Sequence, residues 1–335
     1  MNNQQLKRFL YGKTVVITGA SSGIGHAAAI AFAECGANLV LAARREDVLE
    51  TVAAECEALG VKTIAVKTDV TNAEDMKHLA DTAAAFGNTI DVWINNAGIG
   101  CVGEFTETPV SSHQRVIETN LLGYIHGAHA ALPYFKRQGY GVLINTNSLG
   151  AWIAQPYSVA YAASKFGLRG FSEALRGELI KFPGIYVCDI FPGFIDTPGF
   201  QHGANYVGRK IKPIPPVYDA RRVAHAMVSL AVRPKEAVNV GASAVFFRII
   251  NSLFPTVTQR VLFTLMSSYF KRAKPVPVSD GALFSSDNTD TGIDGGWTSP
   301  HNTRNIVITT AALAAGVGVG YYLLRKKGKR KKTVV

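Results

Sequence analysis

The sequence alternates short β-branched runs with longer alanine-rich stretches from residue 13 to about residue 245, and this alternation restricts the fold more than any other feature. The runs are continuously apolar, as expected of strands buried on both faces of a parallel sheet. They lie at residues 14–18, 38–42, 63–67, 92–95, 142–146 and 185–190, with helix-like stretches between them, for example at 25–35, 47–59 and 73–86. This pattern predicts βαβ units, and therefore a doubly wound α/β domain of the Rossmann type over residues 1–245.

The composition changes after this domain, and so does the expected structure. Residues 242–271 mix large apolar side chains with a few arginines and lysines, a pattern typical of an amphipathic helical pair. Pro255 should divide the two helices, because the residue before a proline disfavours the α conformation. We therefore assign residues 246–272 to a helical extension. Residues 273–305 are rich in Pro, Gly, Ser, Asp and Asn, which predicts a linker.

The C-terminal part combines an uncharged run with a cationic cluster. Residues 306–324 are uncharged throughout, and roughly 20 apolar residues suffice to cross a bilayer core. Seven lysines and arginines follow within 325–335 and supply most of the net charge of +11. Because the excess charge is confined to this tail, we expect no nucleic-acid partner. We expect 306–324 to form a transmembrane or interfacial helix, which attaches the protein to a membrane together with the tail.

Two observations about the membrane orientation conflict. The basic tail favours a cytoplasmic C-terminus, while the lack of an apolar signal segment before residue 14 favours a large domain that faces the cytoplasm. One spanning helix cannot satisfy both, so either the tail crosses the bilayer or 306–324 lies in the interface. The four cysteines are scattered, which fits a reducing compartment and predicts neither disulfides nor a metal site.

A strand that runs into a glycine-rich turn opens the first βαβ unit. Residues 14–18 lead to Gly19, Gly23 and Gly25, after which a helical stretch begins. Glycine allows a positive φ and a close approach to a phosphate, while a helix N-terminus offers free N–H groups to a pyrophosphate. A glycine triplet alone is weak evidence, but this one lies between a strand and a helix, the context that a dinucleotide site requires.

The end of the second strand indicates which dinucleotide is bound. Folds that prefer NAD place an acidic residue there for the ribose 2′-hydroxyl, whereas this chain has Ala43 followed by Arg44 and Arg45. A guanidinium matches a 2′-phosphate in charge and geometry, so we expect NADP(H). The alternative is that Arg44 is a solvated loop charge. We expect Asp69, just after the third strand, to accept a hydrogen bond from the adenine amino group.

Four segments resemble, in order, the motifs of the short-chain dehydrogenase/reductase family. They are TGASSGIG at 18–25, NNAG at 95–98, YAASK at 161–165 and FPGFIDT at 191–197. Ser148 and Asn120 lie 13 and 41 residues before Tyr161, close to the spacing in the family. One departure is Asn147, which stands where the family usually has a serine. The resemblance covers roughly residues 11–245 and implies hydride transfer between a nicotinamide cofactor and an alcohol or carbonyl group.

The resemblance implies roles for four residues. Tyr161 is the expected general acid/base, Ser148 donates to the substrate oxygen, and Asn120 holds a water that links Lys165 to solvent. Tyr161 and Lys165 are four positions apart and share one helix face. The ammonium, with an oxidised nicotinamide, should therefore lower the tyrosine pKa from its usual value near 10. The residues expected to contact the cofactor are Thr18, Gly19, Ser21, Ser22, Gly23, Ile24, Gly25, Arg44, Asp69, Val70, Asn96, Ala97, Gly98, Tyr161, Lys165, Pro192, Gly193, Ile195 and Thr197.

The segment after the last motif should cover the substrate. Residues 197–219 carry apolar side chains among glycines and prolines, which suits a mobile lid over a hydrophobic, lipid-like or polycyclic substrate. Trp152, Tyr157 and Phe200 are candidates for the pocket wall or for ordinary packing. Two other functions stay open: a non-catalytic NADP(H)-binding sensor and a membrane-tethered scaffold. Assembly into a homo-oligomer is a further prediction.

Overall fold

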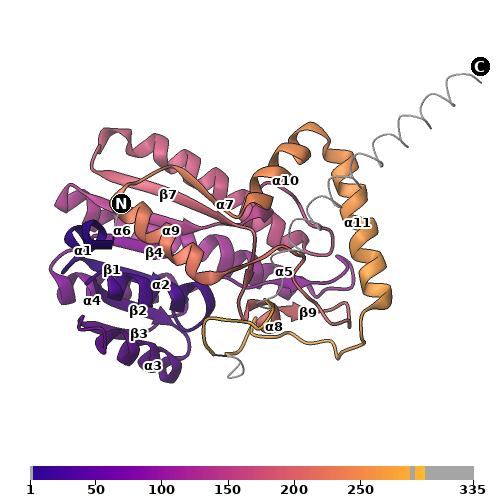
Figure 1. Cartoon of the computed structure of the whole chain (residues 1–335), viewed down its shortest axis with the longest axis horizontal. Coiled ribbons are helices and arrows are strands. Elements are labelled where there is room, and N and C mark those ends of the chain that lie inside the picture. The colour runs from indigo at the N-terminus through magenta and orange to yellow at the C-terminus, as the bar shows by residue number, and fades with distance from the viewer. Residues whose placement is uncertain (1–2, 287–290, 299–335) are drawn as a thin grey trace, which may run out of the picture.

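The centre of the structure is a sheet of seven parallel strands (Figure 1). In this computed structural model, which describes residues 3–286 and 291–298, the strands are β1 (Thr14–Thr18), β2 (Asn38–Ala43), β3 (Thr63–Lys67), β4 (Val92–Asn95), β6 (Gly141–Thr146), β7 (Ile185–Pro192) and β11 (Ala237–Val240). Their order across the sheet is β11-β7-β6-β4-β1-β2-β3. The chain leaves β1 toward β3 and returns to β4 on the other side of β1. The carboxyl ends of β1 and β4 therefore flank a crevice of the kind in which α/β folds bind ligands.

Six of these strands are the predicted ones, which confirms the doubly wound α/β fold. β1, β3 and β4 have the predicted bounds, and β7 runs two residues further than expected. The seventh strand, β11, was missed. It is a short edge strand that pairs with β7 from Ala237 to Val240, and only Val240 of its residues is buried. An edge strand of this kind lacks the continuous apolar run that marks a buried strand.

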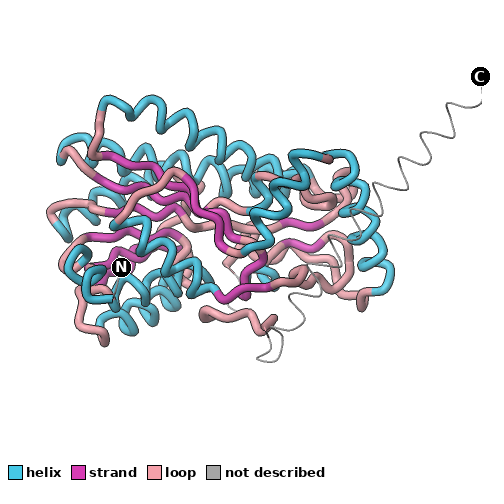
Figure 2. The backbone as a smooth tube through the Cα atoms, turned by 45° about the horizontal axis from the view of Figure 1, so that its top comes forward, coloured by secondary structure: helices cyan, strands magenta, loops and turns pink. Residues whose placement is uncertain are grey.

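Helices cover both faces of the sheet (Figures 1 and 2). On one face α1 (Asn3–Leu10), α2 (Gly23–Glu34), α3 (Glu46–Glu57) and α9 (Ala220–Val232) pack around Ile17, Phe32 and Leu41. On the other face α4 (Ala73–Gly87), α6 (Gly123–Gln138) and α7 (Val159–Glu178) pack around Trp93 and Phe135. Five of the twelve residues of α2 are alanines, so this helix lies close to the sheet and its first turn is brought to the end of β1.

Smaller elements surround the carboxyl edge of the sheet. They are α5 (Val110–Ile117), a π-helical turn (Glu118–Leu122), α8 (Gly199–His202), β5 (Cys101–Val102), β8 (Phe194–Asp196), β9 (Ala204–Asn205) and β10 (Val217–Asp219). β5 pairs with β9, and β8 pairs with β10. The β5–β9 pair ties the segment after β7 back onto the domain, and the β8–β10 pair joins two parts of that segment to each other.

The predicted helical pair is present as α10 (Ala242–Leu253) and α11 (Pro255–Arg272), and Pro255 is the first residue of α11. The described residues of the predicted linker, 273–286 and 291–298, do not leave the domain. They return along its carboxyl edge, and Leu283 is 1% exposed. Among the described residues, no helix combines the length and the apolarity needed to cross a bilayer. Residues 306–324 and 325–335, the predicted membrane helix and basic tail, lie outside the described residues.

Candidate active site

Two adjoining cavities open at the carboxyl edge of the sheet. The first is lined by the glycine-rich turn after β1 and by the ends of β2, β3 and β4. The second is lined by the ends of β6 and β7 and by α7. Both cavities share Ile24, Asn96, Gly98, Ile99 and Thr197. The structure thus places the predicted cofactor residues and the predicted catalytic residues along one continuous space.

The glycine-rich turn is a cradle that only glycine can form. Gly19 and Gly23 have φ values of 64° and 55°, a region that favours glycine. A Cβ on Gly19 would lie 2.7 Å from Ala97 Cα, and a Cβ on Gly25 would lie 2.1 Å from the carbonyl oxygen of Gly19. The turn is therefore pressed against the loop after β4. The first turn of α2 borders the first cavity through Gly23 and Ile24, and a helix N-terminus has backbone N–H groups without partners inside the helix.

Nearly all predicted cofactor residues line one of the two cavities. Thr18 and Gly25 instead support the wall from behind. Thr18 Oγ1 accepts hydrogen bonds from the backbone N–H groups of Asn96 and Ala97 at 2.9 and 3.2 Å. This bond set ties β1 to the loop after β4 and fixes the position of the glycine-rich turn.

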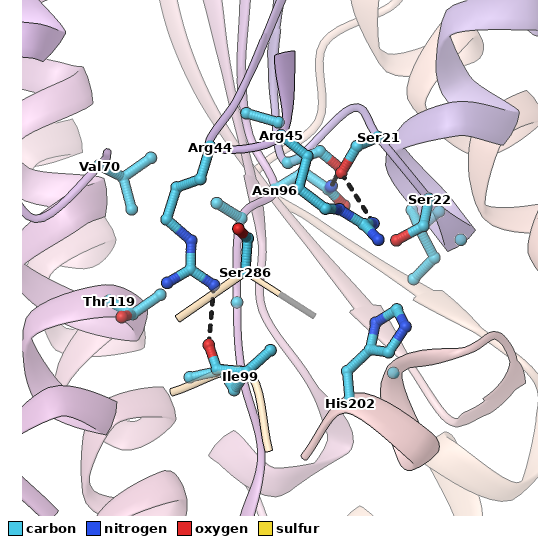
Figure 3. A pocket seen from close by; sticks show the side chains of 18 of the residues that line it. Ser21, Ser22, Arg44, Arg45, Val70, Asn96, Ile99, Thr119, His202 and Ser286 are labelled. Atoms are coloured by element: carbon cyan, nitrogen blue, oxygen red, sulfur yellow. Dashed lines mark hydrogen bonds between the residues drawn. The ribbon is translucent and has the colours of Figure 1, made fainter. Parts of the chain in front are cut away.

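Two arginines after β2 enter the first cavity (Figure 3). Arg45 is 8% exposed and donates to Ser21 Oγ at 3.3 Å. The guanidinium of Arg44 donates to the carbonyl oxygen of Ala282 at 2.7 Å. Burial lowers the pKa of Arg44, and the nearby Arg45 and Arg115 act in the same direction, although Asp69 opposes them. Arg44 is therefore part of the cavity wall, and an anionic ligand there would relieve the repulsion among these cations.

Asp69 lines the same cavity but is already engaged by protein groups. One carboxylate oxygen accepts from the Thr71 backbone and hydroxyl at 3.0 and 2.8 Å, and the other pairs with Arg115 at 2.9 Å. Burial alone would raise the pKa of Asp69, but these hydrogen bonds and the charge of Arg115 outweigh it and hold the pKa below the usual value. Asp69 is thus a fixed carboxylate at the end of the cavity where adenine recognition was predicted.

Tyr161, Ser148 and Lys165 meet in the second cavity. Tyr161 and Lys165 lie one turn apart on α7, and Ser148 lies just after β6. Ser148 Oγ accepts from the backbone N–H of Gly150 at 3.0 Å, and the Ser148 hydroxyl bonds to the Tyr161 hydroxyl. Tyrosine and serine are therefore held side by side, with both hydroxyls facing the cavity.

Burial is the largest influence on the pKa of Tyr161. Burial raises the pKa of Tyr161, and the hydrogen bond from Ser148 offsets only part of this. Burial lowers the pKa of Lys165 to about 7, although the charge of Asp189 opposes this. The lower tyrosine pKa expected from Lys165 together with an oxidised nicotinamide stays a prediction.

Asn120 lies at the centre of the π-helical turn and is fully buried. Its side-chain oxygen accepts from the Ile99 backbone N–H, and its side-chain nitrogen donates to the Ile99 carbonyl, both at 2.8 Å. The side chain thus holds the loop after β4 rather than pointing at Lys165. Single π-helical turns of this kind occur often at functional sites. The water-holding role of Asn120 stays a prediction.

The walls of the second cavity are largely apolar. They include Val102, Leu149, Phe194, Phe200 and Ile211. Phe200 and Ile211 come from the segment predicted to cover the substrate, so this segment does reach the cavity. Trp152 and Tyr157, the other candidates for the wall, pack elsewhere. Trp152 contacts Phe191 and Arg248, and Tyr157 stacks on Phe263 of α11.

Asn147 contributes one uncommitted polar group to this apolar cavity. It is 3% exposed, and its side-chain oxygen accepts from the Ser148 backbone N–H at 3.0 Å. Its Nδ2 has no hydrogen-bond partner among the described residues. Buried donors are normally satisfied, so this amide is available to a ligand that enters the cavity.

Sequence reasoning missed Arg115 and the residues after α11. Arg115 is an ordinary helix arginine in sequence, and only the fold brings it to Asp69. Ala282, Leu283 and Ser286 line the first cavity but lie in a segment whose composition resembles a linker. The apolar run 282–284, which lies between Gly281 and Ser285, was the one signal in the sequence that this segment packs against something.

Comparisons with known proteins agree with this geometry. The family profile of short chain dehydrogenases matches residues 13–205. The uncharacterized oxidoreductase YxnA of Bacillus subtilis (strain 168) is 32% identical over 316 residues, which cover 91% of this chain and 89% of that protein. The 11-beta-hydroxysteroid dehydrogenase A of Sesamum indicum is 34% identical over 250 residues, covering 71% of this chain and 70% of that protein.

Solved structures of oxidoreductases are also similar to this chain. An alcohol dehydrogenase from the archaeon Thermococcus sibiricus, complexed with 5-hydroxy-NADP, superposes with a TM-score of 0.59 at 30% identity, covering 68% of this chain and 95% of that chain. A metagenomic short-chain oxidoreductase in complex with NADP superposes with a TM-score of 0.59 at 26% identity, covering 69% of this chain and 97% of that chain.

Proposed function

This chain belongs to the short chain dehydrogenase family and is an NAD(P)-dependent oxidoreductase; we propose that it transfers a hydride between NADP(H) and an alcohol or carbonyl group of a hydrophobic substrate. The observation that carries the proposal is the meeting of Tyr161, Ser148 and Lys165 in an apolar cavity, which continues into a cavity flanked by Arg44 and Arg45.

The first cavity fits a dinucleotide. Gly19 and Gly23 lie too close to Ala97 and Thr197 to carry a side chain without displacing them, and the first turn of α2 suits a pyrophosphate. Arg44 and Asp69 stand at the adenosine end, and Thr197 stands where the two cavities join. A nicotinamide cofactor bound along this line supplies or accepts the hydride.

The chain's own residues supply the proton and the polarisation. In the reducing direction Tyr161 gives its proton to the substrate oxygen as negative charge develops there, and Ser148 donates a hydrogen bond to the same oxygen. Lys165 holds its ammonium next to the tyrosine, 5.9 Å from the ring centre. Because Lys165 titrates near neutrality, it is able to take up and release the proton that Tyr161 exchanges.

The preference for NADP(H) is proposed from Arg44. Both solved relatives described above hold an NADP-type ligand, and Arg44 enters the cavity that corresponds to the adenosine end. The experiment is to measure dissociation constants for NADPH and NADH by fluorescence, in the wild type and in Arg44→Ala. A charge-assisted pair with a phosphate is worth roughly 1.5–3 kcal/mol, so we expect NADPH to bind about ten- to a hundredfold more weakly in the variant. NADH should be nearly unaffected; an equal loss for both would contradict the proposal.

The hydrophobic substrate is proposed from the cavity wall. Leu149, Phe194, Phe200 and Ile211 favour ligands with extended apolar surface. A relative named for 11-beta-hydroxysteroids is consistent with a polycyclic substrate for this chain. The test is NADPH oxidation over a series of carbonyl compounds of increasing apolar size. We expect kcat/KM to rise with size, and activity confined to small polar carbonyls would rule the proposal out.

We also propose that α10 and α11 bind the surface of an anionic membrane, next to the basic tail. Between residues 237 and 279 the chain has five lysines and arginines and no carboxylate. Ile249, Leu253 and Phe263 on these helices are 53%, 64% and 54% exposed. Exposed apolar side chains among cations suit an anionic lipid surface, whereas a second copy of this positive hairpin would be repelled.

Vesicle sedimentation tests this association. The full chain should bind phosphatidylserine vesicles more strongly than phosphatidylcholine vesicles. Leu253→Asp combined with Phe263→Asp should weaken the binding, while Leu59→Asp, on α3's side of the domain and 46% exposed, is the matched control. If the wild type, the double variant and Leu59→Asp bind the vesicles equally, the attachment lies in other parts of the chain.

A further inference from the structure

The segment after α11 lies along both ends of the first cavity. We call the described residues 279–286 and 291–298 the C-terminal strap. Its first part approaches the adenosine end, beside Arg44 and Arg115. Its second part reaches the first turn of α2 and Thr197. Figure 3 shows Ser286 of the strap facing the same pocket as Arg44 and Arg45.

At the adenosine end, backbone carbonyls of the strap hold the two arginines. Ala282 O accepts from Arg44 at 2.7 Å, and Leu283 O accepts from Arg44 at 3.5 Å and from Arg115 Nε at 3.1 Å. The Leu283 side chain is buried against Cys101, Val116 and Ala204, so these carbonyls are anchored. A guanidinium has five N–H donors, and the carbonyl contacts leave the others for a ligand.

At the pyrophosphate end, the strap pairs with the glycine-rich turn itself. Gly292 O accepts from the backbone N–H of Gly23 at 2.7 Å. The next residues are fixed by Asp196, whose carboxylate accepts from the backbone N–H groups of Gly295, Trp297 and Thr298 at 2.8–3.0 Å. Burial raises the pKa of Asp196, but these hydrogen bonds outweigh it and hold the pKa below the usual value. The carboxylate therefore keeps the charge that this anchor needs.

The fit of the strap is close at two glycines. A Cβ on Gly281 would lie 2.4 Å from the carbonyl oxygen of His202, and a Cβ on Gly295 would lie 2.2 Å from that of Thr197. Outside these contacts, Arg221 pairs with Asp294 through two bonds of 2.8 and 3.0 Å on the surface. The strap lines the first cavity without filling it, since Ala282, Leu283 and Ser286 belong to the wall.

We propose that the C-terminal strap is a working part of the cofactor site. Its first part orients Arg44 and thereby sets the preference for the 2′-phosphate, and its second part closes over the pyrophosphate and slows cofactor release. The strap residues are positioning residues, since they act through Arg44 and the glycine-rich turn. The first half of this proposal rests on the proposed function, because it assumes that Arg44 binds the 2′-phosphate.

The closing role is tested with Gly292→Ala. Gly292 has a φ of 118°, which an alanine rarely adopts, and a Cβ there would meet no atom within 4 Å. The substitution therefore disturbs the strap backbone without reaching the cavity. Gly60→Ala is the matched control, because Gly60 also has a positive φ of 87° and open space around it, on the far side of α3 from the cavity.

The measurement is stopped-flow dissociation of NADPH and of NADH, followed by cofactor fluorescence. Backbone strain of this kind costs roughly 1–3 kcal/mol, so we expect at least about fivefold faster release of both cofactors from Gly292→Ala and no change in Gly60→Ala. Asp294→Ala, which removes the surface pair with Arg221, should act in the same direction if Gly292→Ala does not fold. Release that is unchanged, or slower, in the variant that folds would overturn the closing role.

The orienting role is tested with Gly281→Ala, which must move the carbonyls that hold Arg44. We expect weaker binding of NADPH, with NADH affected less, so that the ratio of the two dissociation constants shifts toward NADH. If the strap has a purely structural role, Gly281→Ala should weaken the binding of NADPH and of NADH equally. That outcome would overturn the orienting role. If Arg44→Ala leaves the ratio of the NADPH and NADH dissociation constants unchanged, the proposed preference for NADP(H) is wrong. That result would not affect the release experiment with Gly292→Ala, which tests the closing role separately.

Discussion

Lys165 donates from Nζ to the carbonyl oxygen of Thr146 at 3.0 Å, and this is the bond that holds its ammonium in the buried interior behind the substrate cavity. The Tyr124 hydroxyl donates to the same carbonyl at 3.0 Å. The nearest carboxylate that acts on Lys165 is Asp189, through space rather than by contact. The ammonium is therefore solvated by one carbonyl and by aromatic rings, which explains why burial dominates its pKa.

This environment predicts a pH dependence of stability. The pKa of Lys165 is about 7 in the folded protein, below its ordinary value of 10.5, so the unfolded chain binds more protons between these two values. Stability should therefore rise with pH in this window, by up to about 1.4 kcal/mol per unit. We expect the free energy of unfolding of Lys165→Met not to show this increase with pH. Urea unfolding at several pH values above neutrality measures it, and equal slopes in both proteins would contradict the prediction.

Tyr161→Phe should abolish turnover and keep cofactor binding. The phenyl ring preserves the cavity wall, while the proton that the tyrosine exchanges with the substrate oxygen is lost. General acid/base catalysis contributes roughly 10²–10⁴-fold, so kcat should fall by at least about a hundredfold. NADPH fluorescence titration is the control and should give an unchanged dissociation constant. A variant with near wild-type kcat would remove Tyr161 from the mechanism.

A buried ion pair between Arg176 and Asp189 should be important for stability. The Asp189 carboxylate is 1% exposed, pairs with Arg176 at 3.0 Å and accepts from Ser172 at 2.8 Å. Removing one partner of such a pair typically costs about 3–5 kcal/mol, and we expect this loss in Arg176→Ala. The double variant Arg176→Ala/Asp189→Asn should recover part of it, as measured by urea unfolding near neutral pH.

The same pair predicts a dependence on pH. Burial raises the pKa of Asp189 to about 6, above its ordinary value of 3.8, so the folded protein binds more protons than the unfolded chain between these values. Stability from this group therefore falls as the pH rises through that window. Without Arg176 the pKa should rise further, and the loss in Arg176→Ala should be larger above about pH 6 than below it. A loss independent of pH would show that Asp189 stays charged without its partner.

Asn147 should contribute to substrate recognition. Its unpartnered Nδ2 lies in the substrate cavity, so a substrate acceptor placed there gains a hydrogen bond of about 0.5–1.5 kcal/mol. We expect Asn147→Ser to raise KM roughly two- to tenfold with little change in kcat. The dissociation constant of NADPH is the control and should stay constant. A fall in kcat alone would instead indicate that Asn147 acts by placing Ser148.

The sheet could be predicted because its strands are buried on both faces. The runs that became β1, β3 and β4 are rich in β-branched and apolar residues, and their bounds were identified to the residue. β11 could not be found in the same way, because it has only four residues and only Val240 among them is buried. The predicted catalytic residues were identified through motif spacing, and the fold does bring Ser148, Tyr161 and Lys165 together.

The strap and the pKa values show where sequence reasoning ends. Gly292 and Ala282 act through backbone carbonyls, which every residue has, so composition could not distinguish a wall from a linker. The Tyr161 pKa depends on the burial of Tyr161 and on the hydrogen bond with Ser148, which spacing along a helix does not reveal. Arg115 meets Asp69 only because α5 passes the end of β3, a contact that the topology determines.

The contact between Arg44 and Leu283 joins residues 239 positions apart. Translation delivers the glycine-rich turn early and the strap hundreds of residues later, so the cofactor pocket gains its final wall only when almost all of the described chain has emerged from the ribosome. Before the strap is synthesised, the cofactor pocket of the nascent chain therefore lacks this wall. The slow cofactor release proposed above would then depend on the strap, and not on the Rossmann core alone.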